Sequence, residues 1–426
     1  MTLDRTQSPD FQRITSIQLP AVDTTTLDNG LLLHLIAISQ QPILRLELIF
    51  DAGTWFETSP TTSFFAVKML AEGTGNRTSA QISEQLDRIG AFLELNSGPD
   101  RASVVVYCLT RFLPDVLPLL RELLTESVFP EKELADLQNI TIQNLKVNFE
   151  KNAHLAGVMA RETLFGAGHP YGRSQRPETV EAVTRADIQA FFDRVIRQRP
   201  YQILLAGQAG EAEIALLNQF FGQQPVGPPA EAPAHTIPTG TAQITLLHEK
   251  PDSLQSSIRV GRLLFTRHHP DFIKVLVMNE VLGGYFGSRL MKNIREEKGF
   301  TYGISSNIAS FRRAGFFMIG TDVKREFTQQ TVDEIRKEIR ILQTEAVPAH
   351  ELETVKNYMA GEFVGSLNTP FEIADRYKTI LLDDLPADFL TSYIARVRAV
   401  TTEDILVMAT SYLAESTLSE IIVGGK

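Results

Sequence analysis

The amino-acid sequence predicts an α+β protein with two homologous domains, each an antiparallel-rich sheet covered by helices. Two observations lead to this fold class. A proline-rich stretch divides the chain near its middle, and the same order of sequence landmarks recurs on both sides of it. With 426 residues, 43% of them hydrophobic, each half is long enough to bury a core of its own.

The dividing stretch covers residues 223–240, where prolines stand among small residues as they do in interdomain linkers. The prolines are Pro225, Pro228, Pro229, Pro233 and Pro238. We therefore predict an N-terminal domain over residues 1–224, a linker over 225–240 and a C-terminal domain over 241–426.

The repeated landmarks are short and lie in the same order in both halves. Phe129-Pro130, followed by Glu133-Leu134, is matched by Val347-Pro348, followed by Glu351-Leu352. The run VTRADI at 183–188 is matched by VTTEDI at 400–405. Such a repeat indicates an internal duplication.

Strands and helices are predicted from the spacing of apolar side chains. Alternation and β-branched residues predict strands over 43–50, 103–109, 201–206 and 418–423. Helical spacing predicts a helix over 80–89, with Thr78 or Ser79 as its cap. Further helices over 112–124 and 329–342 are expected to match each other in the two halves.

Composition excludes some classes of protein. The formal net charge of -10 argues against nucleic-acid binding, which needs clustered Lys and Arg. Cys108 is the only cysteine, so no internal disulfide and no thiolate metal cluster can form, and its apolar strand predicts a buried side chain.

No segment is predicted to cross a membrane, because no apolar run approaches the ~20 residues that a bilayer requires. The first ten residues lack the basic start and apolar core of a signal peptide. We expect a cytoplasmic location, or a periplasmic one if an export signal has been removed.

Several motifs together resemble peptidase family M16, and the resemblance covers nearly the whole chain. They are Leu27-Asp28-Asn29-Gly30, a helix through Phe64-Phe65-Ala66-Val67-Lys68 that runs to Gly73-Thr74, Gly168-His169-Pro170-Tyr171-Gly172-Arg173, the glycine loop Gly283-Gly284-Tyr285-Phe286-Gly287-Ser288-Arg289-Leu290, and the segment from Ile294 to Tyr302. The family includes pitrilysin, insulin-degrading enzyme and the mitochondrial processing peptidase. This chain is similar to its short two-domain members.

The resemblance implies a zinc helix that this sequence does not complete. In the family the helix reads HxxEH, where two histidines bind Zn²⁺ and the glutamate is the general base. Here Phe64 and Lys68 stand at the histidine positions and Val67 at the base position. The third ligand, a glutamate on a later helix, falls near Gln143 and Asn144, where we assign Asn144 as the degenerate position. None of these side chains suits zinc, so no metal is expected in this chain.

The resemblance also implies a substrate-binding pair. In the family an Arg and a Tyr at a seven-residue spacing reach the substrate beside the zinc, and Arg295 and Tyr302 match that spacing. A guanidinium and a phenol can stabilise the oxyanion formed during peptide hydrolysis. The alternative is structural: Arg295 would pair with Glu296 or Glu297, and Tyr302 would pack beneath a sheet.

The glycine loop is assigned a substrate-binding role through Gly283, Gly284 and Gly287, with close helix packing as the alternative. The eight histidines form no spaced pair with an intervening carboxylate. His268 and His269 are expected in a loop before Pro270, and His169 is expected to form hydrogen bonds.

These features predict a non-zinc-binding subunit of a heterodimeric M16 peptidase, inactive by itself. A sister subunit with HxxEH would supply zinc and the general base, and this chain would supply Arg295 and Tyr302 to a peptide substrate. Two alternatives remain: a purely structural M16-like core subunit, and a stand-alone homodimer that binds peptides at a sheet edge.

Overall fold

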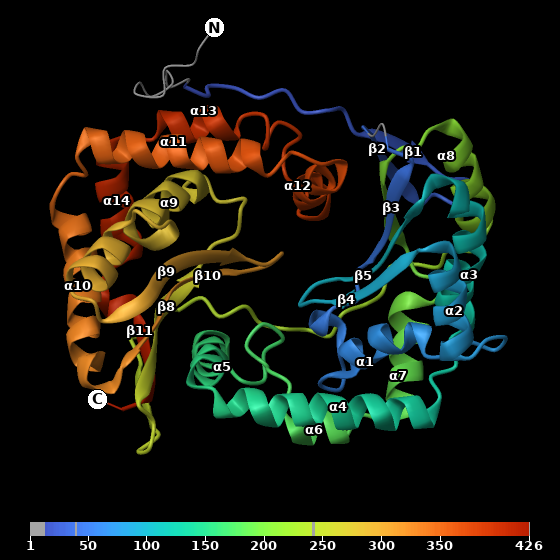
Figure 1. Cartoon of the computed structure of the whole chain (residues 1–426), viewed down its shortest axis with the longest axis horizontal. Coiled ribbons are helices and arrows are strands. Elements are labelled where there is room, and N and C mark those ends of the chain that lie inside the picture. The colour runs from blue at the N-terminus through green and yellow to red at the C-terminus, as the bar shows by residue number, and fades with distance from the viewer. Residues whose placement is uncertain (1–12, 39–40, 241–242, 426) are drawn as a thin grey trace, which may run out of the picture.

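The computed structural model describes residues 13–38, 41–240 and 243–425 and contains two mixed sheets covered by helices (Figure 1). The first sheet has the order β1-β2-β6-β3-β5-β4. Its strands are β1 (Asp23–Thr26), β2 (Leu32–Ala37), β3 (Ile43–Phe50), β4 (Phe92–Ser97), β5 (Ala102–Leu109) and β6 (Tyr201–Gly207).

The second sheet has the order β7-β11-β8-β10-β9. Its strands are β7 (Thr245–Glu249), β8 (Gln255–Leu264), β9 (Thr301–Ser310), β10 (Gly315–Lys324) and β11 (Ser419–Gly424). Each sheet holds one parallel pair, β2 with β6 and β7 with β11, and its other pairs are antiparallel. The shared order confirms the predicted duplication, and β1 is an addition to the first sheet.

The helices also correspond between the halves. The first half contains α1 (Thr62–Lys68), α2 (Ser79–Ile89), α3 (Leu113–Glu126), α4 (Glu131–Glu150), α5 (Asn152–Phe165), α6 (Pro177–Glu181), α7 (Arg185–Phe191) and α8 (Glu211–Leu217). The second contains α9 (Phe272–Asn279), α10 (Thr328–Thr344), α11 (Ala349–Gly365), α12 (Pro370–Leu382), α13 (Tyr393–Ala399) and α14 (Thr402–Tyr412), with the π-helical turns η6 (Glu280–Gly284) and η7 (Met291–Glu297).

The repeated sequence landmarks mark equivalent helix starts. Pro130 and Pro348 precede α4 and α11, where proline suits a position without a backbone N–H donor. Thr184 and Thr401 cap α7 and α14, and each hydroxyl accepts a hydrogen bond from the backbone N–H of an aspartate three residues on. The landmarks are therefore helix N-termini repeated by duplication.

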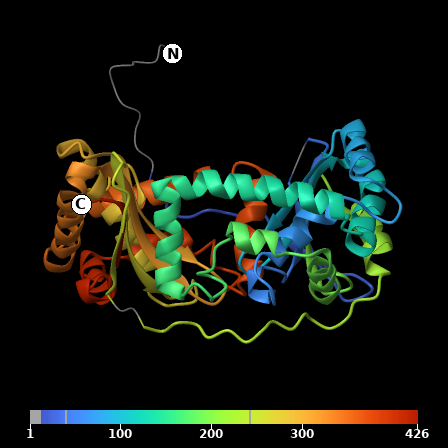
Figure 2. The same ribbon diagram turned by 90° about the horizontal axis from the view of Figure 1, so that it is seen from below.

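Each sheet is covered on one face by its own helices and on the other by a helix from the opposite half. Helix α5 lies on β8 and β11, and α12 lies on β6 and β2 (Figures 1 and 2). The ring of Phe165, at the end of α5, lies 6.1 Å from the ring of Phe316 on β10. Ala374 of α12 packs with Ile36 and Leu204 on the first sheet. The two halves are therefore interlocked.

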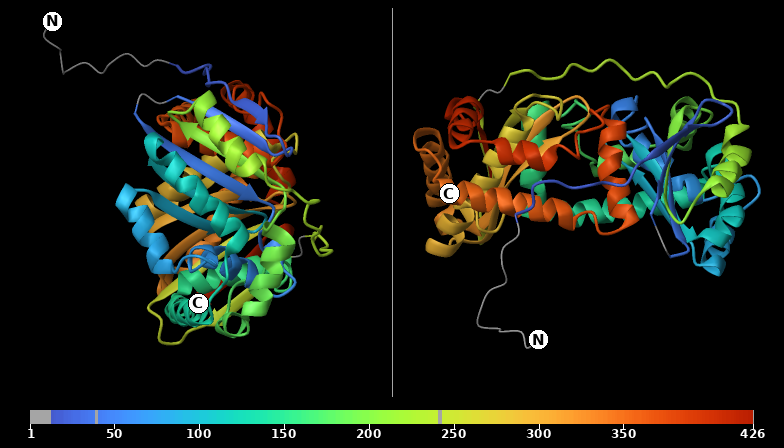
Figure 3. Two further views of the ribbon diagram at one scale, coloured as in Figure 1. Left: turned by 90° about the vertical axis from the view of Figure 1, so that its right-hand side faces the viewer. Right: turned by 90° about the horizontal axis from the view of Figure 1, so that it is seen from above.

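Two extended segments also cross between the halves. Residues 223–240 contain no helix or strand and run along one side of the molecule (Figure 2). On another side, the segment after residue 13 passes along the helices of the second half before it reaches β1 (Figure 3). There, Tyr377 donates a hydrogen bond to the Pro20 carbonyl. The exact domain limits predicted from the sequence stay a prediction.

Two sequence expectations concern burial and membrane spans. Cys108 is buried on β5, and burial raises the pKa of its thiol to about 12. No helix in the described part of the chain is long and apolar enough to cross a membrane.

Candidate functional site

The N-terminus of α1 is held by a buried carboxylate. Glu57 accepts hydrogen bonds from the backbone N–H groups of Thr61 and Ser63, at 3.2 and 2.9 Å, and from the Ser63 hydroxyl at 2.6 Å. An anion suits this position because the first turn of a helix presents unpaired N–H donors and positive dipole charge. Arg173 donates to the same carboxylate at 2.6 Å. Burial raises the pKa of Glu57, while the Ser63 hydroxyl and Arg173 oppose that rise.

The side chains at the degenerate zinc positions pack in the protein, form a hydrogen bond or lie in solvent. Val67 is fully buried in the first core, and the Lys68 ammonium donates to the Leu95 carbonyl on β4. Phe64 is partly buried, with its ring edge-on to that of Phe65 at 5.3 Å. Asn144 is exposed on α4.

These side chains do not fit zinc, which binds imidazole nitrogen, thiolate sulfur or carboxylate oxygen. No group of three or more His, Cys, Asp or Glu side chains with the spacing of a metal site occurs among residues 13–38, 41–240 and 243–425.

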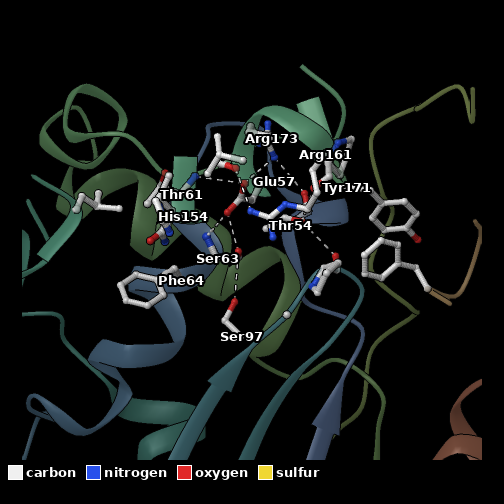
Figure 4. A pocket seen from close by; sticks show the side chains of 18 residues that line it. Thr54, Glu57, Thr61, Ser63, Phe64, Ser97, His154, Arg161, Tyr171 and Arg173 are labelled. Carbon is white, nitrogen blue, oxygen red and sulfur yellow. Dashed lines mark hydrogen bonds and ion pairs between the residues drawn. The ribbon is translucent and has the colours of Figure 1, made fainter. Parts of the chain in front are cut away.

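A cavity of about 420 Å³ lies against the face of α1 that carries Phe64 (Figure 4). Its floor is the hydrogen-bonded group of Glu57, Ser63 and Arg173, and Leu145, not Asn144, reaches it from α4. The remaining lining residues come from four other segments and from the second half. They are Thr54, Thr61, Ser97, Gly98, Pro99, His154, Val158, Arg161, Pro170, Tyr171, Ser174, Gln175 and Phe311.

Arg295 and Tyr302 lie on a different part of the molecule, where Arg295 is half-buried and Tyr302 is exposed. Arg295 belongs to η7, and its guanidinium carbon lies 4.5 Å from the centre of the Phe286 ring, a side chain that is 63% exposed. Tyr302, near the start of the edge strand β9, is 95% exposed. Arg295 has no ion pair within the described residues, so neither structural role weighed for this pair is observed.

A polar groove of about 590 Å³ runs beside Tyr302 across β8, β9 and β10. Its lining includes Arg259, Asn307 and Asp322 in addition to Tyr302. The Tyr302 hydroxyl therefore stands at the edge of a surface rich in donors and acceptors.

The glycine loop is closely packed. A Cβ on Gly283 would lie 2.6 Å from the Ser306 hydroxyl and 2.8 Å from its backbone nitrogen, and one on Gly284 would lie 2.5 Å from the Glu280 carboxyl group. A Cβ on Gly287 would lie 2.8 Å from the Tyr285 ring. Close packing of η6 on β9 is thus observed, and the substrate-binding role of these glycines stays a prediction.

The histidine expectations agree with the structure. His169 accepts a hydrogen bond from the Tyr171 backbone N–H at 3.1 Å, and His268 and His269 lie in the turn before Pro270. Sequence reasoning missed Glu57 and Arg161. Neither belongs to a repeated motif, and their importance arises from neighbours that are distant in the sequence.

Comparison with known proteins gives consistent matches. The family model described as "Insulinase (Peptidase family M16)" matches residues 35–167, and the model "Peptidase M16 inactive domain" matches residues 182–359. An uncharacterized zinc protease of Bacillus subtilis is 22% identical over 345 residues, which covers 78% of this chain and 82% of that protein. A probable mitochondrial-processing peptidase subunit beta of Schizosaccharomyces pombe is 24% identical over 64% of this chain and 61% of its own.

Solved structures share the fold. The peptidase M16 inactive domain from Pseudomonas fluorescens has a TM-score of 0.87 at 24% identity, covering 95% of this chain and 98% of its own. The periplasmic protease PqqL from Escherichia coli has a TM-score of 0.77 at 16% identity, and this whole chain covers 48% of that one.

Proposed function

The chain belongs to peptidase family M16, and we propose that it is the non-zinc-binding subunit of a heterodimeric M16 peptidase. A sister subunit with HxxEH would hold the zinc and the general base. This chain would contribute Arg295 and Tyr302 to binding of the peptide substrate and to stabilisation of the oxyanion. By itself the chain would be inactive.

The observation that carries this proposal is the contrast between the two sets of predicted site residues. Val67, at the general-base position, is fully buried, and Lys68, at a histidine position, donates to the Leu95 carbonyl, so neither side chain is available for zinc chemistry. Tyr302, in contrast, is exposed, and the half-buried Arg295 stacks on the Phe286 ring and has no ion pair within the described residues. An exposed phenol and a guanidinium stacked on an exposed ring are suited to meet a substrate held by another chain.

The chemistry expected of the pair is electrostatic. Attack of water on a peptide carbonyl places negative charge on its oxygen, and a fixed donor can stabilise that charge by roughly 3 kcal/mol. The same donors orient the peptide before attack. The glycine loop, which packs η6 against β9, would set the position of η7 and thus of Arg295.

Pairing with a second M16 unit has indirect support. The Escherichia coli protease is about twice the length of this chain, because this chain covers 48% of it, which leaves room for another unit of similar size. That protease is described as periplasmic, whereas the cytoplasmic location expected here from the N-terminal sequence stays a prediction.

The test is to express the chain alone and together with a zinc-bearing homologue from the same genome. Metal content and cleavage of a quenched peptide library are measured for both preparations. We expect negligible zinc and cleavage from the chain alone, and cleavage from the complex. Arg295→Ala and Tyr302→Phe are expected to lower kcat of the complex about 100-fold each without loss of assembly.

Two outcomes would contradict the proposal. Full activity of both variants in an active complex would make the pair structural and favour a core subunit without a chemical role. Stoichiometric zinc in the isolated chain would show that the interpretation of the α1 positions is wrong.

A further inference from the structure

The cavity beside Phe64 is lined on one side by the exposed side chain of Arg161. Arg161, on α5, donates from Nη2 to the Ser174 hydroxyl at 3.1 Å and forms no ion pair with any other described residue. Its neighbour Glu162 is engaged with Arg176 at 2.6 Å. Burial lowers the pKa of Arg161, and the neighbouring Glu162 carboxylate opposes that change.

The single carboxylate of the cavity cannot serve as that partner. Glu57 is saturated by hydrogen bonds from Thr61, Ser63 and Arg173, and its side chain is fully buried. Arg173 is correspondingly occupied by Glu57 and by the Thr54 carbonyl. Arg161, which Figure 4 shows beside Arg173, is therefore the guanidinium of this cavity that has no carboxylate bonded to it among the described residues.

Apolar and aromatic side chains line part of the cavity, among polar ones such as Ser97, His154 and Gln175. Phe64 faces the cavity from α1, Leu145 from α4 and Val158 from α5, while Tyr171 and Phe311 stack at 4.5 Å at the junction of the two halves. The volume of about 420 Å³ lies in the range of roughly 300–1,000 Å³ typical of small-ligand pockets. Such a space suits an apolar side chain attached to an anion.

We propose that this cavity binds the C-terminal carboxylate of a peptide whose last side chain is apolar. Arg161 is the anchor, because a guanidinium offers a carboxylate two parallel hydrogen bonds. The apolar side chain lies against Phe64, Leu145 and Val158. A histidine or carboxylate in place of Phe64 would make this wall polar.

The test uses the full chain expressed alone, so its result does not depend on any sister subunit. Calorimetric titration at low salt compares an acetylated tripeptide ending in phenylalanine, with a free carboxylate, and the same tripeptide as its C-terminal amide. A third, amidated peptide carries its carboxylate on a glutamate side chain. We expect the free acid to bind about tenfold more tightly than either amide.

Variants separate Arg161 from general electrostatics. Arg161→Gln is expected to remove the preference for the free acid, and Arg161→Lys, which keeps the charge but loses the paired hydrogen bonds, to reduce it. Lys151→Gln is the matched control, since it removes an exposed cation at the start of α5 that does not line the cavity, and is expected to change the affinity less than about twofold. Thermal denaturation verifies that each variant is folded.

The proposal is overturned if the acid and the amide bind alike, if neither binds, or if Arg161→Gln retains the preference. If the amidated peptide with a glutamate side chain binds as tightly as the free acid, the cavity does not select a C-terminal carboxylate. Should Arg161→Gln fail to fold, the comparison of acid and amide on the unmodified chain, together with Arg161→Lys, still decides the question.

Discussion

At the scale of single residues, burial sets the protonation of Glu280. This carboxyl group lies in η6, and burial, followed by the nearby Glu362 carboxylate, raises its pKa to about 7. Its Oε2 atom is buried without a hydrogen-bond partner among the described residues. Between its ordinary pKa near 4.5 and about 7, the folded protein retains a proton that the unfolded chain releases. Ionisation of Glu280 therefore reduces stability as the pH rises through this range.

Replacement of Glu280 by Gln should remove this pH dependence. We expect Glu280→Gln to be more stable than the unmodified chain by about 1–2 kcal/mol at pH 8, with the difference vanishing near pH 4.5. The measurement is urea unfolding at pH values from 4.5 to 8. Glu326→Gln, at an exposed position, is the control. If Glu280→Gln and the unmodified chain differ in free energy of unfolding by the same amount at every pH, the raised pKa of Glu280 is contradicted.

Glu57 is also a buried carboxylate, but unlike Glu280 it accepts hydrogen bonds at both oxygens and is paired with Arg173. Glu57→Gln would leave Arg173 without its anion and weaken the N-terminus of α1. We expect a loss of about 2–4 kcal/mol in the free energy of unfolding. Urea denaturation at pH 7 measures it, with Glu84→Gln on the exposed face of α2 as the control. A loss equal to that of the control would mean that Glu57 does not hold the helix.

At the scale of elements, α12 is attached to the first sheet by buried charges as well as apolar contacts. Arg45 on β3 contacts Glu47 at 2.5 Å and Asp375 at 2.8 Å, and Lys378 contacts Glu47 at 3.1 Å. Arg45 and Glu47 are buried, so each depends on the other for neutralisation. Asp375 and Lys378 also pair with each other at 3.2 Å.

This arrangement predicts non-additive mutations. Arg45→Met should cost about 3–5 kcal/mol, because Glu47 is then buried with a single partly exposed partner. The double variant Arg45→Met, Glu47→Leu should be less destabilised than Arg45→Met alone, since Asp375 and Lys378 retain each other. Denaturant unfolding of the set gives the coupling energy, and a double variant whose cost equals the sum of the single ones would refute the cluster.

At the scale of the whole molecule, the exchange of α5 and α12 makes each core depend on both halves. Each sheet has one face covered by a helix from the other half, so the removal of either helix exposes apolar surface on the opposite sheet. Salt bridges reinforce this dependence, with Arg312 contacting Asp51 at 3.1 Å and Arg313 contacting Asp100 at 2.8 Å.

We therefore predict one cooperative thermal transition for the full chain instead of two. Ala374→Asp, which buries a charge between α12 and the first sheet, should lower the single Tm by about 10 °C or more. The same substitution at the exposed Ala80, in the first turn of α2, should have little effect. Scanning calorimetry with two resolved transitions would contradict the interlocked architecture.

Much of the fold could be predicted from the sequence because its signals are local. Residues 43–50 alternate along a strand, and the structure has β3 over the same residues. Thr78 caps α2 through Gln81, as its spacing suggests. The exchange of α5 and α12 could not be predicted, because the apolar face of a helix does not reveal which of two similar sheets it covers.

The candidate site was predictable only in part, and for a related reason. Residue identity alone shows that Phe64, Val67, Lys68 and Asn144 are poor zinc ligands. The structure is needed to show where each side chain lies. Leu145, and not Asn144, lines the cavity, and Tyr302 is exposed to solvent. The carboxylate that caps α1 and the unpaired Arg161 emerge only when segments distant in the sequence come together.

The sequence by itself determined the duplicated α+β plan, the family and the residue types at the zinc positions, since these depend on spacing and chemical identity along the chain. The tertiary structure decided which groups are neutralised and which are free. Glu57 is saturated and Arg161 is not, although nothing in their local sequences distinguishes them. Electrostatic balance depends on distances between segments, and those distances exist only in the folded chain.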